Sequence, residues 1–287
     1  MFHSYQEVFM KVGVIGTGTL GPSIAQVFSQ CGQIEMVYLC KGRESSTRTG
    51  LEAIQSSFNK LIRKEKLDQE TANRYLRKIE TGSKSILKDA DLIVEAVVEN
   101  LQVKREVLQE IDSICVKKAV FATNTSSLPI RAIGEGLSRP LIGMHFFNPA
   151  PVMKLVEVIS SSDTPYEMVE YLMDTARMLG KTPIEVKEAP GFVVNRVLIP
   201  MINEAISIYA EGVASAEDID TAMKLGANHP MGPLELADLI GLDVVLAILD
   251  VMLKETGDMK YRPEALLKRM VREKKLGRKT GEGFYKY

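Results

Sequence analysis

The sequence predicts an α/β domain built on a mostly parallel sheet, followed by an all-helical domain. As far as residue 188, short apolar runs alternate with helical patterns, as expected for parallel strands joined by helical crossovers. Beyond the sequence Ala189-Pro190-Gly191, the apolar spacing is almost wholly helical. We therefore expect a first domain over residues 1–188 and a second over residues 189–287.

The first elements form a strand, a helix and a second strand. Lys11 to Ile15 is a short apolar run of the kind that forms a buried parallel strand. Apolar residues then recur at helical spacing from Leu20 to Cys31, where the pattern ends at a glycine. A second apolar run from Met36 to Cys40 completes a βαβ unit.

The rest of the first domain continues this alternation. Residues 50–78 are helical and charged in pattern, and a further helix is expected from Val103 to Ile114. Apolar runs predict strands over four further segments, residues 90–98, 120–123, 141–144 and 155–159.

The second domain is expected to begin with a long apolar helix from Phe192 to about Glu211. Ser215 and Asp218 occupy the positions of a capping box, which predicts the start of a helix that ends near Leu225. Further helices are expected as far as about residue 275.

The composition excludes several classes of function. A net charge of -1 leaves no excess of cations to neutralise nucleic-acid phosphates. Apolar runs fall short of the roughly 20 residues that a bilayer requires, and the N-terminus lacks the pattern of a signal peptide. Three scattered cysteines favour a reducing cytoplasm, and the three histidines show no zinc-binding spacing. We therefore expect a cytoplasmic protein without a metal site.

Residues 16–21 form a GxGxxG motif, Gly16-Thr17-Gly18-Thr19-Leu20-Gly21. Alone, such a motif is often only a tight turn, but here it follows a strand and opens a helix, the context of dinucleotide binding in a Rossmann fold. The first glycine permits the turn, the second lets the backbone approach a pyrophosphate, and the third lets the helix pack on the strand. We expect these six residues to bind a nicotinamide dinucleotide.

The second strand lacks the acid that normally contacts the ribose 2′-hydroxyl of NAD, about 20 residues after the motif. After Cys40 the chain continues Lys41-Gly42-Arg43, and the first acid is Glu44. Lys41 and Arg43 fit the 2′-phosphate of NADP. Alternatively, both are solvated loop cations and NAD binds without that contact, so the sequence leaves the choice of cofactor open.

Six further segments occur in a characteristic order: NTSSL at 124–128, GMHFFNP at 143–149, PVMKLVEV at 151–158, PGFVVNR at 190–196, GANHPMGP at 226–233 and GRKTGEGFYKY at 277–287. Together with the glycine turn they resemble the short-chain 3-hydroxyacyl-CoA dehydrogenases, in particular the bacterial members that act on 3-hydroxybutyryl-CoA. The resemblance covers essentially residues 11–287. The missing second-strand acid is a departure from the family's usual pattern.

The resemblance implies reversible interconversion of an (S)-3-hydroxyacyl-CoA and a 3-oxoacyl-CoA by hydride transfer with NAD(P), in β-oxidation of fatty acids or in butyrate metabolism. It implies His145 and Glu157 as the catalytic pair, with Ser126 and Asn195 contacting the substrate. It also implies a homodimer formed through the second domain. Further cofactor contacts fall on Glu99, Lys104, Ser126, Asn148 and Lys279, and contacts to coenzyme A on Ser57, Lys64 and Ser126.

Chemistry alone also selects His145 as the general base. Oxidation of a secondary alcohol needs a group that accepts a proton near neutrality, which suits an imidazole. His3 lies in the N-terminal tail and His229 in a turn bounded by prolines, whereas His145 follows a short apolar strand, toward the strand end where ligands collect. A hydrogen-bonded core histidine is the alternative.

Glu157 lies between two valines of an apolar strand, where a carboxylate is costly unless it is paired. Paired with His145, it would fix the imidazole tautomer and stabilise the imidazolium. Alternatively, it faces water from an edge strand, near Lys154. Spacing alone leaves both interpretations open, and the resemblance favours the catalytic pair.

The remaining candidates also have structural alternatives. Ser126 and Asn195 are able to hydrogen-bond a substrate oxygen, yet Ser126 also suits a turn, whereas Asn195 lies in an apolar helix whose interior disfavours Asn. Ser57 and Lys64 share a charged helical segment with other cations, which is alternatively a solvated face.

Two rival functions follow from the same predicted fold. A Rossmann dehydrogenase acting on free β-hydroxy acids relies on a catalytic lysine in the long helix, where this chain carries Asn195 and Arg196. A catalytically silent protein on the same fold is the other rival. The intact set of Ser126, His145, Glu157 and Asn195 argues against it.

Overall fold

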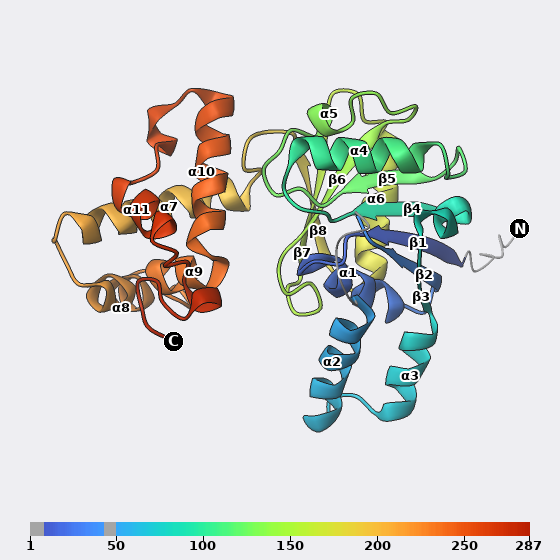
Figure 1. Cartoon of the computed structure of the whole chain (residues 1–287), viewed down its shortest axis with the longest axis horizontal. Coiled ribbons are helices and arrows are strands. Elements are labelled where there is room, and N and C mark those ends of the chain that lie inside the picture. Colours follow the sequence, from blue (N-terminus) through green and yellow to red (C-terminus); the bar gives the residue numbers. More distant parts are fainter. Residues whose placement is uncertain (1–8, 43–49) are drawn as a thin grey trace, which may run out of the picture. The chain divides into compact units, whose positions relative to one another are not determined.

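The computed structural model describes residues 9–42 and 50–287. The chain divides into two compact units, one ending at Glu188 and the other spanning Ala189–Tyr287 (Figure 1). Across the described residues, no helix combines the length and the apolar character needed to cross a membrane.

The first unit is built on an eight-stranded sheet with the order β3-β2-β1-β4-β5-β6-β7-β8. Strands β6 and β7 pair antiparallel, and every other neighbouring pair is parallel. This arrangement confirms the expected mostly parallel sheet. The strand bounds are β1 Met10–Ile15, β2 Ile34–Cys40, β3 Ile79–Gly82, β4 Leu92–Glu95, β5 Val120–Thr123, β6 Leu141–Phe146, β7 Leu155–Ser160 and β8 Thr182–Lys187.

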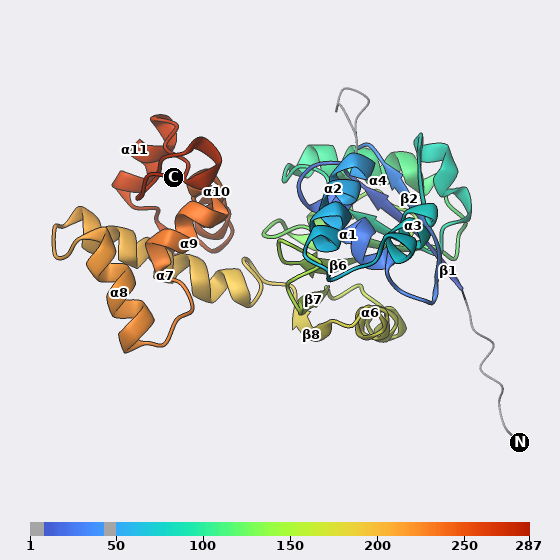
Figure 2. The ribbon, with the colours of Figure 1, turned by 90° about the horizontal axis from the view of Figure 1, so that it is seen from below.

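Helices pack against this sheet and extend beyond it. Helix α1 packs on β1 and β2, and α6 packs on β7 and β8 (Figure 2). Helices α2 and α3 lie side by side and project away from the sheet (Figure 1). The helix bounds are α1 Leu20–Ser29, α2 Gly50–Arg63, α3 Gln69–Arg77, η1 Lys84–Asp89, α4 Leu101–Asp112, α5 Ile130–Ile133 and α6 Tyr166–Met178.

The structure departs from the sequence prediction in several elements. The charged segment at 50–78 is two helices, because Asp68 caps α3 by accepting a hydrogen bond of 2.7 Å from the Thr71 backbone N–H. The strand expected over residues 90–98 is shorter, since β4 ends at Glu95. Strands β3 and β8 were not predicted; both are sheet edges with mostly exposed or half-buried residues, so neither carries an apolar run.

The second unit is helical, as the sequence predicts. Its core is formed by fully buried residues such as Ile199, Ile202 and Ile206, whose spacing follows one face of α7. The capping residue Ser215 accepts a hydrogen bond of 3.1 Å from the Asp218 backbone N–H, as expected. The bounds are α7 Val194–Ala210, α8 Ala216–Gly226, α9 Pro233–Ile240, α10 Leu242–Thr256, η2 Met259–Tyr261, α11 Ala265–Arg272 and η3 Arg278–Thr280.

Two buried aspartates hold the C-terminal segment of the second unit in place. Asp220 accepts hydrogen bonds from the backbone N–H groups of Leu234 and Glu235 and, at 2.8 Å, from the Tyr285 hydroxyl. Asp238 accepts from the backbone N–H groups of Phe284 and Tyr285 and from the Tyr287 hydroxyl. The terminal sequence is therefore fixed by carboxylates that would be costly to bury without these donors.

Replacing Tyr285 with Phe removes one of the donors to Asp220 while the carboxylate stays buried. We expect the free energy of unfolding to fall by about 1–3 kcal/mol in urea titrations. Tyr287→Phe is the matched control, since Tyr287 is half exposed and its hydrogen bond to Asp238 is longer, at 3.2 Å. Equal urea midpoints for wild type and Tyr285→Phe would show that this hydroxyl does not stabilise the unit.

Candidate active site

The three glycines of the turn between β1 and α1 differ in what a side chain at each position would meet. Gly16 has a φ of +124°, and a Cβ at this position would lie 2.3 Å from the Ala96 carbonyl oxygen. A Cβ at Gly21 would lie 1.9 Å from the carbonyl oxygen of Gly16, so this glycine allows α1 to pack against the turn. A Cβ at Gly18 would meet nothing within 4 Å. The backbone at Gly18 is therefore open to a ligand.

The start of α1 is suited to a phosphate. Within the described residues, the Thr19 side chain makes no capping hydrogen bond, and the first turn of α1 carries no acid. Its N–H groups and the positive end of the helix dipole are thus available to an anion. The residues of the turn fit the pyrophosphate of a dinucleotide.

A pocket of about 850 Å³ opens beside the same turn. Strands β2 and β3 end next to one another here, with Cys40 paired to Gly82. Lys41 follows β2 and lines the pocket, and Lys84, which also lines it, pairs with Glu110 of α4. Arg43, the second cation considered for a 2′-phosphate, lies outside the described residues.

His145 and Glu157 face one another across the antiparallel pair of β6 and β7. The register places His145 directly opposite Glu157, and His145 Nδ1 lies 2.8 Å from Glu157 Oε2. Both side chains are buried, with Glu157 fully so. Glu157 therefore does not face water, and with its carboxylate ionised it accepts a hydrogen bond from Nδ1–H. The hydrogen bond to Glu157 thus involves Nδ1 and not Nε2.

Ser126 follows β5 in a loop that is organised by Glu99. The Oε1 atom of Glu99 accepts hydrogen bonds from the Thr125 hydroxyl at 2.7 Å, the Ser126 N–H at 2.9 Å and the Ser127 N–H at 3.1 Å. Burial raises the pKa of Glu99, but the Lys104 charge and these hydrogen bonds outweigh it, so the pKa lies below its usual value. Glu99 is thus held as a carboxylate.

Lys104 of α4 lies inside the first unit rather than at its surface. It is only 1% exposed, and its ammonium contacts Glu95 Oε1 at 2.9 Å and Glu99 Oε2 at 3.3 Å. Glu95, which is not among the residues predicted from the sequence, ends β4 and is fully buried. The available signal was the same as for Glu157, namely a carboxylate within an apolar run.

Two other residues that sequence analysis missed support the strand that carries His145. Asn124 Oδ1 accepts a hydrogen bond of 2.8 Å from the Phe146 N–H, which ties the end of β5 to β6. Lys181 donates to the carbonyl oxygens of Ala150 and Met153, in the loop that joins β6 to β7. Burial lowers the pKa of Lys181.

The remaining expected contacts of the first unit are accessible to ligands. Asn148 is exposed and is followed by a cis peptide bond to Pro149. Ser57 is half-buried on α2, and Lys64 is exposed just after the end of that helix. Within the described residues, no group of His, Cys, Asp and Glu side chains is arranged to hold a metal ion.

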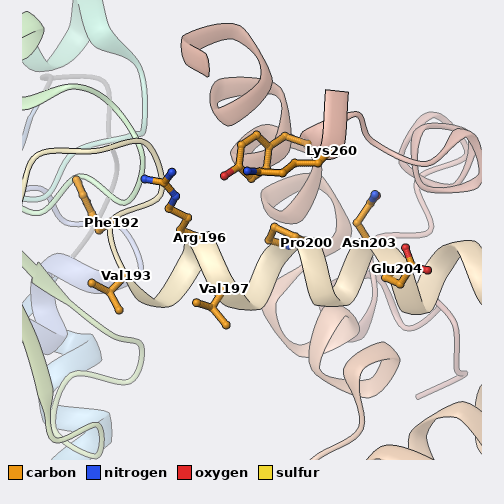
Figure 3. A pocket seen from close by; sticks show the side chains of 9 residues that line it. Phe192, Val193, Arg196, Val197, Pro200, Asn203, Glu204 and Lys260 are labelled. Atoms are coloured by element: carbon orange, nitrogen blue, oxygen red, sulfur yellow. The ribbon is translucent and has the colours of Figure 1, made fainter. Parts of the chain in front are cut away.

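Asn195 and Lys279 belong to the second unit. Asn195 is the second residue of α7, so it lies in the first turn and not in the helix interior from which its role was argued. Lys279 forms an ion pair with Asp243. A pocket of about 640 Å³ runs along α7, and Figure 3 shows Arg196 and Lys260 on one side of this helix and Val197 on the other.

Comparisons with known proteins identify the family. Residues 11–189 match the NAD binding domain of 3-hydroxyacyl-CoA dehydrogenase, and residues 191–287 match the C-terminal domain. A 3-hydroxybutyryl-CoA dehydrogenase of Clostridioides difficile is 50% identical over 97% of this chain and 99% of its own. The human mitochondrial hydroxyacyl-coenzyme A dehydrogenase is 43% identical over 99% of this chain and 93% of its own.

A solved structure agrees with these matches. The crystal structure of (S)-3-hydroxybutyryl-CoA dehydrogenase PaaH1 from Ralstonia eutropha is similar with a TM-score of 0.90 and 44% identity, over 97% of this chain and 99% of that one. Both domains, in the expected order, are therefore accounted for. The chain belongs to the 3-hydroxyacyl-CoA dehydrogenase family.

Proposed function

We propose that this protein interconverts (S)-3-hydroxybutyryl-CoA, or a similar short-chain (S)-3-hydroxyacyl-CoA, and the corresponding 3-oxoacyl-CoA by hydride transfer with NAD(P). The contact of 2.8 Å between His145 Nδ1 and Glu157 Oε2 carries this proposal. It supplies an oriented acid–base group within a chain whose relative of 50% identity is named a 3-hydroxybutyryl-CoA dehydrogenase and whose relative of 48% identity is named a probable one.

The reaction needs one proton transfer and one hydride transfer. A bound nicotinamide supplies the hydride acceptor in the oxidising direction. His145 Nε2 takes the proton of the substrate hydroxyl as the carbonyl forms, and the Glu157 carboxylate stabilises the resulting imidazolium. In the reducing direction the same imidazolium returns the proton to the developing alkoxide.

Polar side chains position the reacting oxygen and the coenzymes in this proposal. Asn195 donates a hydrogen bond to the substrate oxygen as its charge changes. The Ser126 hydroxyl, which donates to Glu99 Oε1 at 3.2 Å in the structure, redirects its single O–H to the same oxygen when the substrate binds. The turn at residues 16–21 binds the pyrophosphate, and the cofactor also contacts Glu99, Ser126, Asn148 and Lys279. Lys104 acts on the cofactor site through Glu99, because its ammonium is already held between two carboxylates. Ser57 and Lys64 bind coenzyme A.

The pocket at the end of β2 favours a cofactor with a 2′-phosphate. Lys41 is an exposed cation at the position where NAD-specific sites carry an acid. Among the described lining residues, the acids are Glu52 and Glu110, which come from helices, and Glu110 is paired with Lys84. NADP is therefore accepted at this site in our proposal, alongside NAD.

The second unit forms a homodimer interface in this proposal. It exposes large apolar side chains that a monomer would leave in water, with Val197 and Val213 each 70% exposed and Leu225 83% exposed.

Cys31, Cys40 and Cys115 are buried and form no disulfide, which fits a reducing cytoplasm.

An absorbance assay tests the function directly. Wild-type protein is expected to oxidise NADH or NADPH when acetoacetyl-CoA is added. His145→Ala should lower kcat by about 10²- to 10⁴-fold, because the proton donor is lost. Binding of the reduced cofactor, followed by its fluorescence, should be unchanged in the variant. Turnover of His145→Ala near the wild-type rate would remove His145 as the acid–base group.

Glu157→Gln should change the pH dependence as well as the rate. The imidazolium that forms when His145 takes the substrate proton loses its counter-charge in the variant. In the oxidising direction, kcat is therefore expected to fall by about tenfold or more, and its pH profile to depart from that of the wild type. A profile that overlays the wild-type profile would mean that the two side chains are not coupled during turnover.

Cofactor discrimination is tested by replacing both Lys41 and Arg43 with Ala. If these cations bind a 2′-phosphate, the KM for NADPH should rise by about tenfold or more, while the KM for NADH changes by less than about threefold. Arg74→Ala and Arg77→Ala, made together on the exposed face of α3, form the control for a general loss of positive charge. Equal losses for both cofactors would show that Lys41 and Arg43 do not read the 2′ position.

A further inference from the structure

Glu95 is the centre of a buried polar cluster at the end of β4. Its carboxylate is fully buried and accepts hydrogen bonds from the Val97 N–H at 2.6 Å and from the Thr123 hydroxyl at 2.6 Å. The Lys104 ammonium contacts both of its oxygens, at 2.9 and 3.1 Å. A carboxylate this deep is tolerated only because each oxygen has a partner.

Lys104 connects Glu95 to a second carboxylate, that of Glu99. The same ammonium lies 3.3 Å from Glu99 Oε2 and 3.4 Å from the Val97 carbonyl oxygen. One ammonium is therefore shared by two carboxylates, which leaves a net charge of about -1 on the three side chains. Glu99 is the exposed member, because 34% of its side chain is accessible whereas Glu95 is fully buried.

The cluster reaches the Ser126 loop by two routes. In the first route, Glu99 accepts hydrogen bonds from the N–H groups of Ser126 and Ser127 and from the hydroxyl of Thr125. In the second route, Thr123, whose hydroxyl donates to Glu95, accepts the Thr125 N–H at 3.3 Å. Three successive loop residues thus accept or donate hydrogen bonds within a network that connects to Glu95 through Lys104 or Thr123.

Packing stability alone gives no reason for charged side chains at this position. Well-packed apolar side chains of similar volume often stabilise a core as well as a buried ion pair does, or better. What charged groups add is direction, since each hydrogen bond here specifies where one atom of the next residue lies. In this case the series of hydrogen bonds runs from Glu95, at the end of β4, to the Ser126 hydroxyl.

We propose that Glu95 is a positioning residue for the reaction: by holding Lys104 and Thr123, it fixes Glu99 and the loop 125–127, and thereby the Ser126 hydroxyl. This inference rests on the proposed function, in which Ser126 contacts the reacting oxygen. Because Ser126 then acts mainly on the transition state, loss of Glu95 should lower kcat more than it raises the KM for the acyl-CoA.

The test is a double-mutant cycle of Glu95→Gln and Glu99→Gln, with acetoacetyl-CoA and the better reduced cofactor. Each single variant is expected to lower kcat by about tenfold or more, with KM changed by less than about threefold. If Glu95 acts through Glu99, the double variant should be no slower than the slower single variant, within about threefold. Effects on kcat that multiply would overturn the proposal, as would a Glu95→Gln kcat within about twofold of wild type.

Asp112→Asn provides the matched control for a general loss of stability. Asp112 ends α4, the helix of Lys104, and its carboxylate holds the Ser138 N–H and Arg139 Nε, at 2.7 and 2.6 Å. The Asp112→Asn variant is expected to keep kcat within about twofold of wild type, even where its Tm falls. In the double variant with Glu99→Gln, the effects of the two substitutions on kcat should multiply. The coupling in kcat between Asp112→Asn and Glu99→Gln should be weaker than that between Glu95→Gln and Glu99→Gln. Equally strong coupling would mean that Glu95 has only a structural role.

Thr123 gives a gentler test if Glu95→Gln does not fold. Thr123→Val keeps the volume but removes the hydroxyl, whereas Thr123→Ser keeps it. The proposal expects a loss of kcat in Thr123→Val that Thr123→Ser restores, and equal kcat in both variants would overturn it. An inactive wild-type enzyme would overturn the proposed function and this inference together, whereas an active one without these couplings overturns only the inference.

Discussion

The antiparallel pairing of β6 with β7 is the constraint on which the candidate site depends. In a sheet whose other neighbours are parallel, this reversal brings two residues that lie twelve positions apart into direct opposition. Cross-strand neighbours have their Cβ atoms close enough for a short side-chain contact. The pair of His145 and Glu157 is therefore set by strand register and needs no flexible loop to form. Asn124 and Lys181 reinforce the same strand and the loop that follows it.

What the sequence predicts well is what neighbouring residues determine. The strand, glycine turn and helix of residues 10–29 are local, and the demand at Gly21 arises from the Gly16 carbonyl oxygen within the same turn, whereas Gly16 also faces Ala96 after β4. The pairing of His145 with Glu157 was left open by spacing, because a run of apolar residues does not encode whether the next strand returns parallel or antiparallel. The edge strands β3 and β8 escaped notice for a related reason, since few of their residues are buried.

The cluster around Glu95 shows what sequence reasoning overlooks. A charged residue in an apolar run predicts a functional role at Glu157, and the same signal is present at Glu95, whose carboxylate is also fully buried. The difference lay in the partner, because a single histidine is conspicuous while Lys104 is one of many charges on a helix. Asn195 illustrates the opposite error. Its position was argued from a helix interior, but α7 begins one residue before it, where a polar residue needs no special reason.

Among the described residues, the buried carboxylates are Glu95, Glu157, Asp220 and Asp238. The kind of partner distinguishes the carboxylates that hold the chain in place from the one that faces a histidine. The two aspartates accept from backbone N–H groups and tyrosine hydroxyls, and burial raises the pKa of Tyr285 further above neutrality. Glu95 is paired with the Lys104 ammonium, which also contacts Glu99. Only Glu157 faces a group whose ordinary pKa lies near neutrality, an imidazole. The same device of a fully partnered buried carboxylate thus fixes the chain at three positions, and at the fourth it supports a side chain able to exchange a proton.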